Sequence, residues 1–181
     1  MNADRRYPET VSGPFEEPPV AFVDREDREI EIRPYSGTEA EFEALVEMYA
    51  DFDPSDRAQG IPPGQEPRVR TWLESILSED CLNVIAWDGE TAAGHSTLVP
   101  DGEDDYELAI FVLQAYQEAG IGTHLIESLL GHGAANDISK VWLTVERWNR
   151  PAVALYKKVG FETTGAESFE LEMAIRLGED D

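Results

Sequence analysis

The stretch VLQAYQEAGIGTHL, residues 112–125, decides how this chain is interpreted. An apolar segment at 106–113, typical of a buried strand, leads into it, and apolar residues at helical spacing follow it. Gly120 and Gly122 stand at the mouth of that helix. The first N–H groups of a helix have no partner inside it, and the helix dipole adds partial positive charge. The turn can therefore accept a diphosphate without basic side chains, although Q-x-x-G-x-G on its own is more often plain turn geometry.

Around this stretch, the hydrophobic periodicity predicts a mixed α/β sheet. Thr38 and Glu41 have the spacing of a capping box at the start of the first helix. Residues 51–67 are rich in proline and glycine and form a loop too long for a simple connector. The expected elements are, in chain order, a strand at 29–33, helices at 38–49 and 69–77, strands at 82–87, 91–99 and 106–113, a helix from 120 to 131 or 133, a strand at 140–145, a helix at 149–159, and strands at 161–165 and 169–177, with a turn at 101–105 and a frayed end from 178.

Residues 1–28 precede the periodic part of the chain. They are rich in proline and charge, and their one apolar cluster is Val-Ala-Phe-Val at 20–23. Such a composition is typical of a segment that cannot form a core of its own. We therefore expect a flexible N-terminal arm over residues 1–28, for which the apolar cluster offers a docking point, and one domain over residues 29–178.

The charge of the chain restricts its partners. Acidic residues number 38 and basic residues 14, for a formal net charge of −24. Such a surface repels phosphate backbones and anionic lipid, which argues against nucleic-acid and membrane partners. Because salt screens this repulsion, the charge favours a protein of a salt-rich cytoplasm, as in a halophile; an ordinary acidic protein with cationic partners is the alternative. The chain start lacks an apolar core of signal-peptide length, so we expect a cytoplasmic location. One cysteine, Cys81, and three scattered histidines argue against a metal site.

Two motifs together resemble those of the GNAT N-acetyltransferase superfamily. Residues 117–122 are similar to its [QR]-x-x-G-x-[GA] motif, which follows a strand and opens a helix. The segment NRPAVALYKKVGF, residues 149–161, is similar to its second pattern, N-x-x-A-x-x-x-Y-x-x-x-G-F. The resemblance covers roughly residues 29–177. It implies the GNAT fold, an α/β fold with a mixed, mostly antiparallel sheet flanked by helices and splayed between its fourth and fifth strands, here 106–113 and 140–145.

The resemblance also implies a cofactor, acetyl-CoA, and the residues that hold it. In the family, the backbone of the fourth strand pairs with the pantetheine arm at a bulge, main-chain N–H groups of the glycine turn hold the pyrophosphate, and the motif asparagine lies near the pantetheine end. No metal is needed. The corresponding residues are Ile110, Phe111 and Val112 for the strand, Gln117, Glu118, Ala119, Gly120, Ile121 and Gly122 for the turn, and Asn149.

Two catalytic roles follow from the same resemblance. Tyr156 corresponds to the family tyrosine that gives a proton to the leaving thiolate; a core aromatic with its hydroxyl at the rim is the alternative. Family members that acetylate ribosomal-protein N-termini often carry a glutamate where this chain has Thr144, so that mechanism is not carried over. Glu107 resembles the general base of many other members, with Glu146 in reserve. In a chain this acidic, either could be a plain solvated acid.

The motifs together predict an N-acetyltransferase that moves an acetyl group from acetyl-CoA to a primary amine by direct attack in a ternary complex. A noncatalytic acyl-CoA-binding or regulatory module is the alternative. The amine acceptor has no motif of its own, because the 51–67 loop and the last strands shape its site in this fold. Acidic walls would suit a polyamine, lysine or aminoglycoside, and Trp148, beside Asn149, is a candidate for lining the cleft. A homodimer is a further expectation, since dimers are common in the family.

Overall fold

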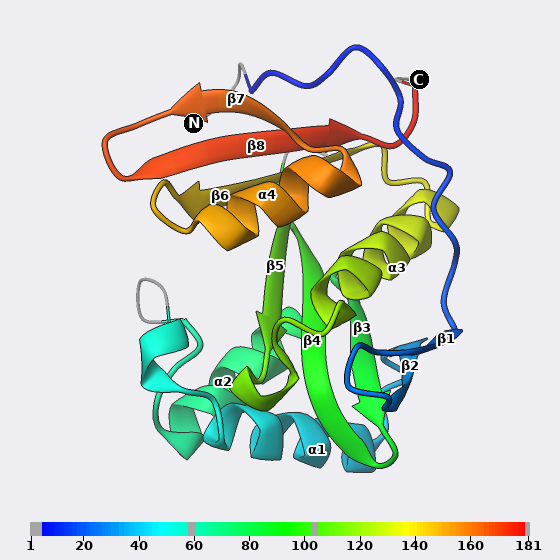
Figure 1. Cartoon of the computed structure of the whole chain (residues 1–181), viewed down its shortest axis with the longest axis vertical. Helices are drawn as coiled ribbons and strands as arrows, with labels where there is room; N and C mark the ends of the chain where they lie inside the picture. The colour runs from blue at the N-terminus through cyan, green and yellow to red at the C-terminus, as the bar shows by residue number, and fades with distance from the viewer. Residues whose placement is uncertain (1–4, 58–60, 103–104, 180–181) are drawn as a thin grey trace.

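An eight-stranded sheet in the order β1-β2-β3-β4-β5-β6-β8-β7 organises the molecule (Figure 1). The computed structural model describes residues 5–57, 61–102 and 105–179, so parts of the predicted arm, loop, turn and frayed end lie outside the described residues. Neighbouring strands are antiparallel except for the parallel pair β5–β6. The strands are β1 Val20–Val23, β2 Glu29–Pro34, β3 Leu82–Asp88, β4 Thr91–Pro100, β5 Tyr106–Val112, β6 Lys140–Glu146, β7 Glu162–Ala166 and β8 Glu170–Arg176.

Helices cover the two faces of this sheet (Figure 1). Val84 of β3 packs into the core formed with α3 and α4, whereas the next residue, Ile85, packs into the core formed with α1 and α2. Successive strand residues point to opposite faces, so one strand supplies both cores. The helices are α1 Glu39–Ala50, α2 Glu66–Ile76, α3 Ile121–Ala135 and α4 Arg150–Val159, with short 3-10 turns η1 Pro54–Asp56 and η2 Gln114–Tyr116.

The sheet opens between β5 and β6, as predicted. These strands are in register only at Tyr106–Val141 and Glu107–Trp142, whereas β6 pairs with β8 along its whole length. Beyond Glu107, β5 therefore has no strand on that side. The expected bulge does not appear in the β4–β5 ladder, which runs in unbroken register from Tyr106 to Val112. The gap arises because β6 turns away together with β8, as Figure 1 shows.

The sheet begins earlier in the chain than the predicted domain boundary at residue 29. The apolar cluster at 20–23 forms β1, an edge strand paired with β2. Upstream, the backbone N–H of Ser12 donates to the carbonyl of Arg176 at 2.8 Å. The segment that the sequence presents as an arm thus runs from the C-terminal end of β8 past α3 to β1 (Figure 1). A run of only four apolar residues gave too short a pattern to predict this strand.

Two helix boundaries also differ from the prediction. α3 continues through Gly131 and Gly133 to Ala135, because these glycines serve packing and do not end the helix. A Cβ at Gly131 would come within 2.5 Å of the carbonyl oxygen of Glu16, so the N-terminal segment passes directly over the helix there. α2 begins at Glu66, with Pro67 in its first turn, where a missing N–H costs nothing. The predicted capping box of Thr38 and Glu41 is confirmed.

Candidate active site

The glycine turn leaves the N-terminus of α3 without a side-chain cap. Gly120 is the N-cap residue, and its φ of 90° lies in the left-handed region that glycine adopts without strain. As a glycine, Gly120 has no side chain that could accept a hydrogen bond from the first turn of the helix. The N–H groups that follow Gly120 are therefore not capped by that residue, and their binding of a diphosphate stays a prediction. Glu118, with a φ of 59°, completes the sharp turn, while Ala119 and Ile121 are buried and anchor it to the core.

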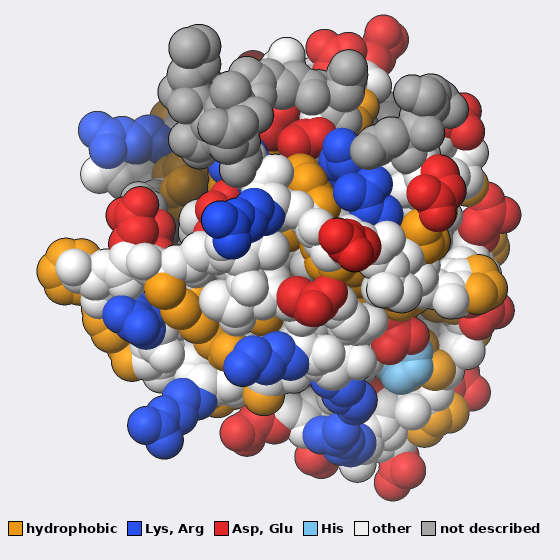
Figure 2. Space-filling model, turned by 90° about the horizontal axis from the view of Figure 1, so that it is seen from above, with side chains coloured by type: hydrophobic (Ala, Val, Ile, Leu, Met, Phe, Trp, Pro, Cys, Tyr) orange, Lys and Arg blue, Asp and Glu red, His pale blue; other side chains and the backbone are white. Residues whose placement is uncertain are grey.

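Two basic side chains lie near this turn, and no local sequence pattern predicts their position. A hollow of about 200 Å³ borders Gly120 and is lined by Arg25 from the β1–β2 turn and Lys158 from α4, among others. The backbone N–H of Arg25 donates to the carbonyl of Ala119 at 3.1 Å, which fixes the β1–β2 turn against the glycine turn. Figure 2 shows Lys and Arg side chains among the carboxylates at the β7–β8 end of the molecule. The mouth of α3 therefore carries positive side chains in a strongly acidic protein.

The remaining motif residues lie at the open edge of β5 and the start of α4. The Nε2 of Gln117 donates to the carbonyl of Val112 and to Asp56, both at 3.0 Å, so the motif glutamine ties the turn to β5 and to the α1–α2 connection. Phe111 packs among the aromatic rings on the α1–α2 side, whereas Ile110 and Val112 pack toward α3 and α4.

Asn149 is the N-cap of α4. Its side chain accepts a hydrogen bond from the backbone N–H of Ala152 at 3.4 Å. This contact stabilises the first turn of the helix, because a capping side chain satisfies a donor that the helix itself leaves unpaired. A contact of Asn149 with the cofactor stays a prediction.

Tyr156 is buried on the inner side of α4. Its ring lies 5.8 Å from that of Phe161, centroid to centroid, and burial raises the pKa of its phenol to about 12. No hydrogen bond of its hydroxyl is found among the described residues, and Tyr156 as a whole is 8% exposed. A phenol in this environment stays protonated at neutral and mildly alkaline pH.

Acidic side chains share the face of the sheet opposite α3 and α4. Glu107 lies beside Trp142, and Glu146 lies beside Glu170, each pair in direct register across neighbouring strands. Registered residues project to the same face, and that face also holds Glu172. The Glu107 carboxylate reaches solvent, but the surrounding walls remove part of its hydration. This desolvation raises the pKa of Glu107, the charges of Asp101 and Glu170 raise it further, and Arg5 lowers it.

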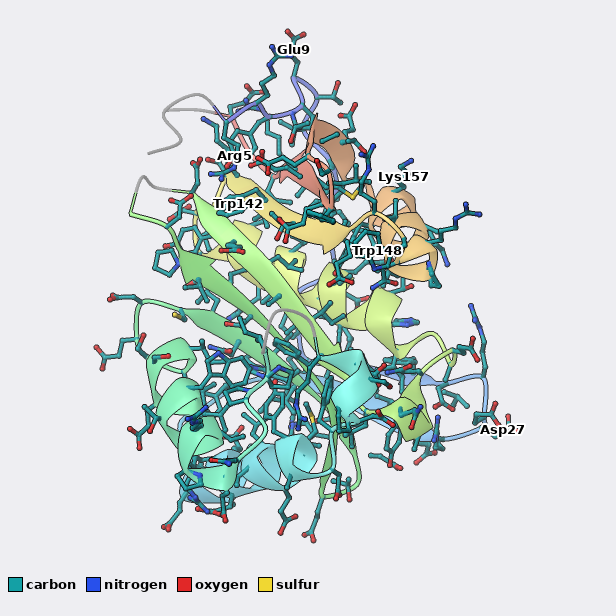
Figure 3. The ribbon with its side chains drawn as sticks, turned by 90° about the vertical axis from the view of Figure 1, so that its left-hand side faces the viewer. Arg5, Glu9, Asp27, Trp142, Trp148 and Lys157 are labelled. Carbon is teal, nitrogen blue, oxygen red and sulfur yellow. The ribbon has the colours of Figure 1, made fainter. Side chains whose placement is uncertain are left out.

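Arg5 brings the N-terminal segment onto this same face, where Figure 3 shows it beside Trp142. Its guanidinium lies 3.5 Å from the centre of the Trp142 ring and forms ion pairs with Asp101 and Glu172. Only 6% of the Arg5 side chain is exposed. A residue far from both motifs in sequence therefore enters the neighbourhood of the predicted base. No local pattern could have indicated it.

A second hollow, of about 400 Å³, lies where β6 ends. It is lined by Glu146, Trp148, Glu167, Phe169 and Glu170. Trp148 is the predicted lining residue of the cleft and Glu146 the reserve base, and the structure brings both next to the turn between β7 and β8. Within the described ranges, no group of three or more His, Cys, Asp or Glu side chains is arranged to hold a metal ion.

A splayed mixed sheet with an uncapped helix N-terminus beside its open edge defines the acyl-CoA N-acyltransferase class. The chain belongs to the acetyltransferase (GNAT) family, whose family model matches residues 42–161. That family uses acetyl-CoA. The glycine turn, the free N-terminus of α3 and the cations Arg25 and Lys158 suit its diphosphate.

Several known proteins resemble parts of the chain or its fold. The mycothiol acetyltransferase of Corynebacterium glutamicum is 40% identical over 86 residues, which is 47% of this chain and 29% of that protein. The GNAT domain of S. lividans PAT has a TM-score of 0.75 at 16% identity, covering 87% of this chain and 96% of that one. The PaiA N-acetyltransferase of Thermoplasma acidophilum, solved in complex with coenzyme A, has a TM-score of 0.63 at 19% identity, covering 81% and 98%. At these identities the structural matches show the fold alone.

The chain spans less than half the length of the curated relatives it matches. Across the described part of the chain, no helix has the length and apolar character needed to cross a bilayer.

Proposed function

We propose that this chain transfers an acetyl group from acetyl-CoA to a primary amine by direct attack within a ternary complex. The observation that carries the proposal is the open edge of β5 beside the uncapped N-terminus of α3, in a chain of the GNAT family. The open edge offers backbone groups to a pantetheine arm, and the helix mouth offers N–H groups to its diphosphate. Coenzyme and amine would then meet where β5 and β6 part.

In the proposed reaction, the neutral amine nitrogen attacks the thioester carbonyl, a C–N bond forms, and the C–S bond breaks. Tyr156 gives its phenolic proton to the departing thiolate. The proton lost by the amine passes to Glu107, directly or through water. Two features support Glu107 over Glu146: it lies at the last β5–β6 pair, where the strands separate, and its raised pKa makes its carboxylate a better proton acceptor.

The noncatalytic acyl-CoA-binding module is the second candidate. It is favoured by Arg5, which the chain itself places on the acidic face where an acceptor amine would bind. A turnover assay separates the two. The protein is mixed with acetyl-CoA and a panel of primary amines, and released CoA is measured with a thiol reagent against the constant signal of Cys81. Amine-dependent CoA release supports the enzyme, whereas tight CoA binding without release supports the module.

The broader expectations carry over as proposals. We place the protein in a salt-rich cytoplasm, with no nucleic-acid or membrane partner, because its net charge of −24 repels both. A homodimer stays a prediction, which sedimentation equilibrium tests directly.

A further inference from the structure

The hollow at the end of β6 exposes two aromatic rings. Trp148 is 61% exposed and Phe169 is 68% exposed, and they are two of the five large hydrophobic residues that the structure describes as exposed. Their rings meet edge to face, 6.1 Å apart at an interplanar angle of 77°. A pair of large exposed rings that together line a hollow is a typical sign of a binding surface, since single exposed apolar residues need no such arrangement.

Carboxylates complete the walls of this hollow. Glu146, Glu167 and Glu170 line it together with the two rings. The indole N–H of Trp148 donates to Glu146 at 3.0 Å, which fixes both the ring and the carboxylate. The nearby Arg147 donates to the backbone carbonyl of Glu167. Aromatic faces and carboxylates have one ligand chemistry in common, because both attract a cation.

The same face of the sheet already holds one cation between an aromatic ring and carboxylates. Arg5 lies over the ring of Trp142 with carboxylates of Asp101 and Glu172 on its guanidinium, and it is almost wholly buried there. Five cation–ring contacts occur among the described residues, and none involves Trp148 or Phe169. The rings at the end of β6 therefore resemble an occupied cation site of this protein, but no Lys or Arg of the described residues lies over them.

The hollow lies on the same face of the sheet as the predicted base. Glu170 is close enough to Glu107 for its charge to act on that carboxyl, and Glu170 is in register with Glu146. A ligand in the hollow can therefore extend toward the place where β5 and β6 separate.

We propose that the hollow lined by Trp148, Phe169 and Glu167 binds a second ammonium group of the acceptor, so that the acceptor is an aliphatic diamine or polyamine. This inference rests on the proposed function, because it assigns the substrate class of the same site. One ammonium group lies against the two rings and the carboxylates, and the other nitrogen, once neutral, is the nucleophile beside Glu107.

Calorimetry on the CoA-saturated protein tests the proposal, with 1,5-diaminopentane and pentylamine as probes that differ only in the second ammonium group. At one fixed KCl concentration, the wild type should bind the diamine about tenfold more tightly. Glu167→Gln and Phe169→Leu should each reduce that preference about threefold. Glu29→Gln is the charge-matched control, because Glu29 is exposed on β2, at the far side of the sheet.

Steady-state turnover with the same probes separates this inference from the proposed function. Equal affinity for the two probes, or variants that weaken both equally, would overturn the cation site whatever the activity. A preference for the diamine that the two variants reduce supports the site even if no amine is acetylated. In that last case the proposed enzyme fails, while the assignment of the hollow stands on the binding data alone.

Discussion

Tyr156 is the residue on which proton delivery to the thiolate depends in the proposed mechanism. Burial raises the pKa of its phenol to about 12, so the proton-donating form persists across the pH range of any practical assay. Tyr156→Phe should lower kcat by roughly 10²–10⁴-fold and leave affinity for acetyl-CoA nearly intact. Stopped-assay kinetics and calorimetry check this, with Tyr35→Phe, remote from α4, as control. An unchanged kcat would make Tyr156 a core aromatic.

Glu107 should set the acid limb of the pH profile. Desolvation raises the pKa of this carboxyl, and a base works only when ionised, so kcat/KM should fall with decreasing pH through a value above the ordinary 4.5 of glutamate. Glu107→Gln should lower kcat/KM most at neutral pH, and the loss should shrink at high pH, where more amine is already deprotonated.

Glu146→Gln provides the comparison for that experiment. Glu146 lies at the other end of the β5–β6 gap and in the acidic hollow, so its loss should affect the KM of a diamine more than the pH profile. A pH-dependent defect in Glu146→Gln with a silent Glu107→Gln would move the base to β6. If both variants keep the wild-type profile, the proton leaves through water.

His95 ties together a buried polar network on the α1–α2 side. Its Nδ1 lies 2.6 Å from the Tyr49 hydroxyl and its Nε2 lies 2.7 Å from the Asn83 side-chain oxygen. Burial lowers its pKa to about 3, so only the unfolded state takes up the proton below pH 6.5. The free energy of unfolding should therefore decrease from pH 6.5 toward pH 5, with a slope that approaches about 1.4 kcal/mol per pH unit near pH 5.

Urea unfolding at several pH values measures this slope. The lowered pKa of His132 acts in the same direction, so His95→Gln isolates the contribution of His95. That variant should show a much flatter profile between pH 6.5 and 5, at some cost in stability. An identical slope in wild type and variant would contradict the assignment.

At the scale of the elements, the glycine turn should be sensitive to charge. A Cβ at Gly120 would lie 3.9 Å from the Nε of Arg25, so Gly120→Asp would both fill the mouth of α3 and pair with a cation that suits the diphosphate. Acetyl-CoA affinity should fall by more than tenfold, as for removing a charge-assisted contact and adding repulsion. Calorimetry measures the loss.

Gly89→Asp is the matched control for the glycine turn. Gly89 also has a positive φ, of 63°, and a Cβ there meets nothing within 4 Å. This variant also places a side chain at a positive φ and adds the same charge, but it lies in the β3–β4 turn, away from the site. Unchanged acetyl-CoA affinity in Gly120→Asp would remove the turn from the cofactor site. Gly122→Asp is a poorer probe, since its Cβ would contact Leu155 of α4 at 3.4 Å.

The elements also show how far the sequence could predict the fold. Periodicity was enough for the flanking helices and for every strand except β1, and the resemblance carried by the two motifs implied the gap between β5 and β6. The predicted end of α3 was wrong because Gly131 does not end the helix. A glycine is needed there since the backbone of Glu16, more than a hundred residues away in the chain, passes directly over it. The same holds for the site, because Arg5 and Arg25 reach it only through tertiary packing. Phe169 contacts Trp148 only through tertiary packing as well. In the hollow at the end of β6, the sequence therefore indicated Trp148 and Glu146 but not Phe169.

For the whole molecule, the balance of charge should govern stability. A net charge of −24 on one folded domain repels itself, and this repulsion is weaker in the extended unfolded chain. The Debye length falls from about 10 Å at 0.1 M salt to about 3 Å at 1 M, so salt removes most of the penalty. We therefore expect Tm to rise steadily from low salt to molar KCl, which differential scanning calorimetry measures.

Salt also strengthens hydrophobic burial, so a rising Tm alone would not identify screening as the cause. A variant with Glu47, Glu74, Glu79 and Glu90 replaced by Gln separates the two effects, because all four side chains are exposed and lie outside the proposed site. Screening predicts a higher Tm for this variant at low salt and a shallower rise with KCl. If Tm rises with the same slope in wild type and variant, the rise is caused by stronger apolar burial. If the Tm of the wild type does not change with KCl, the acidic surface has no role in salt adaptation.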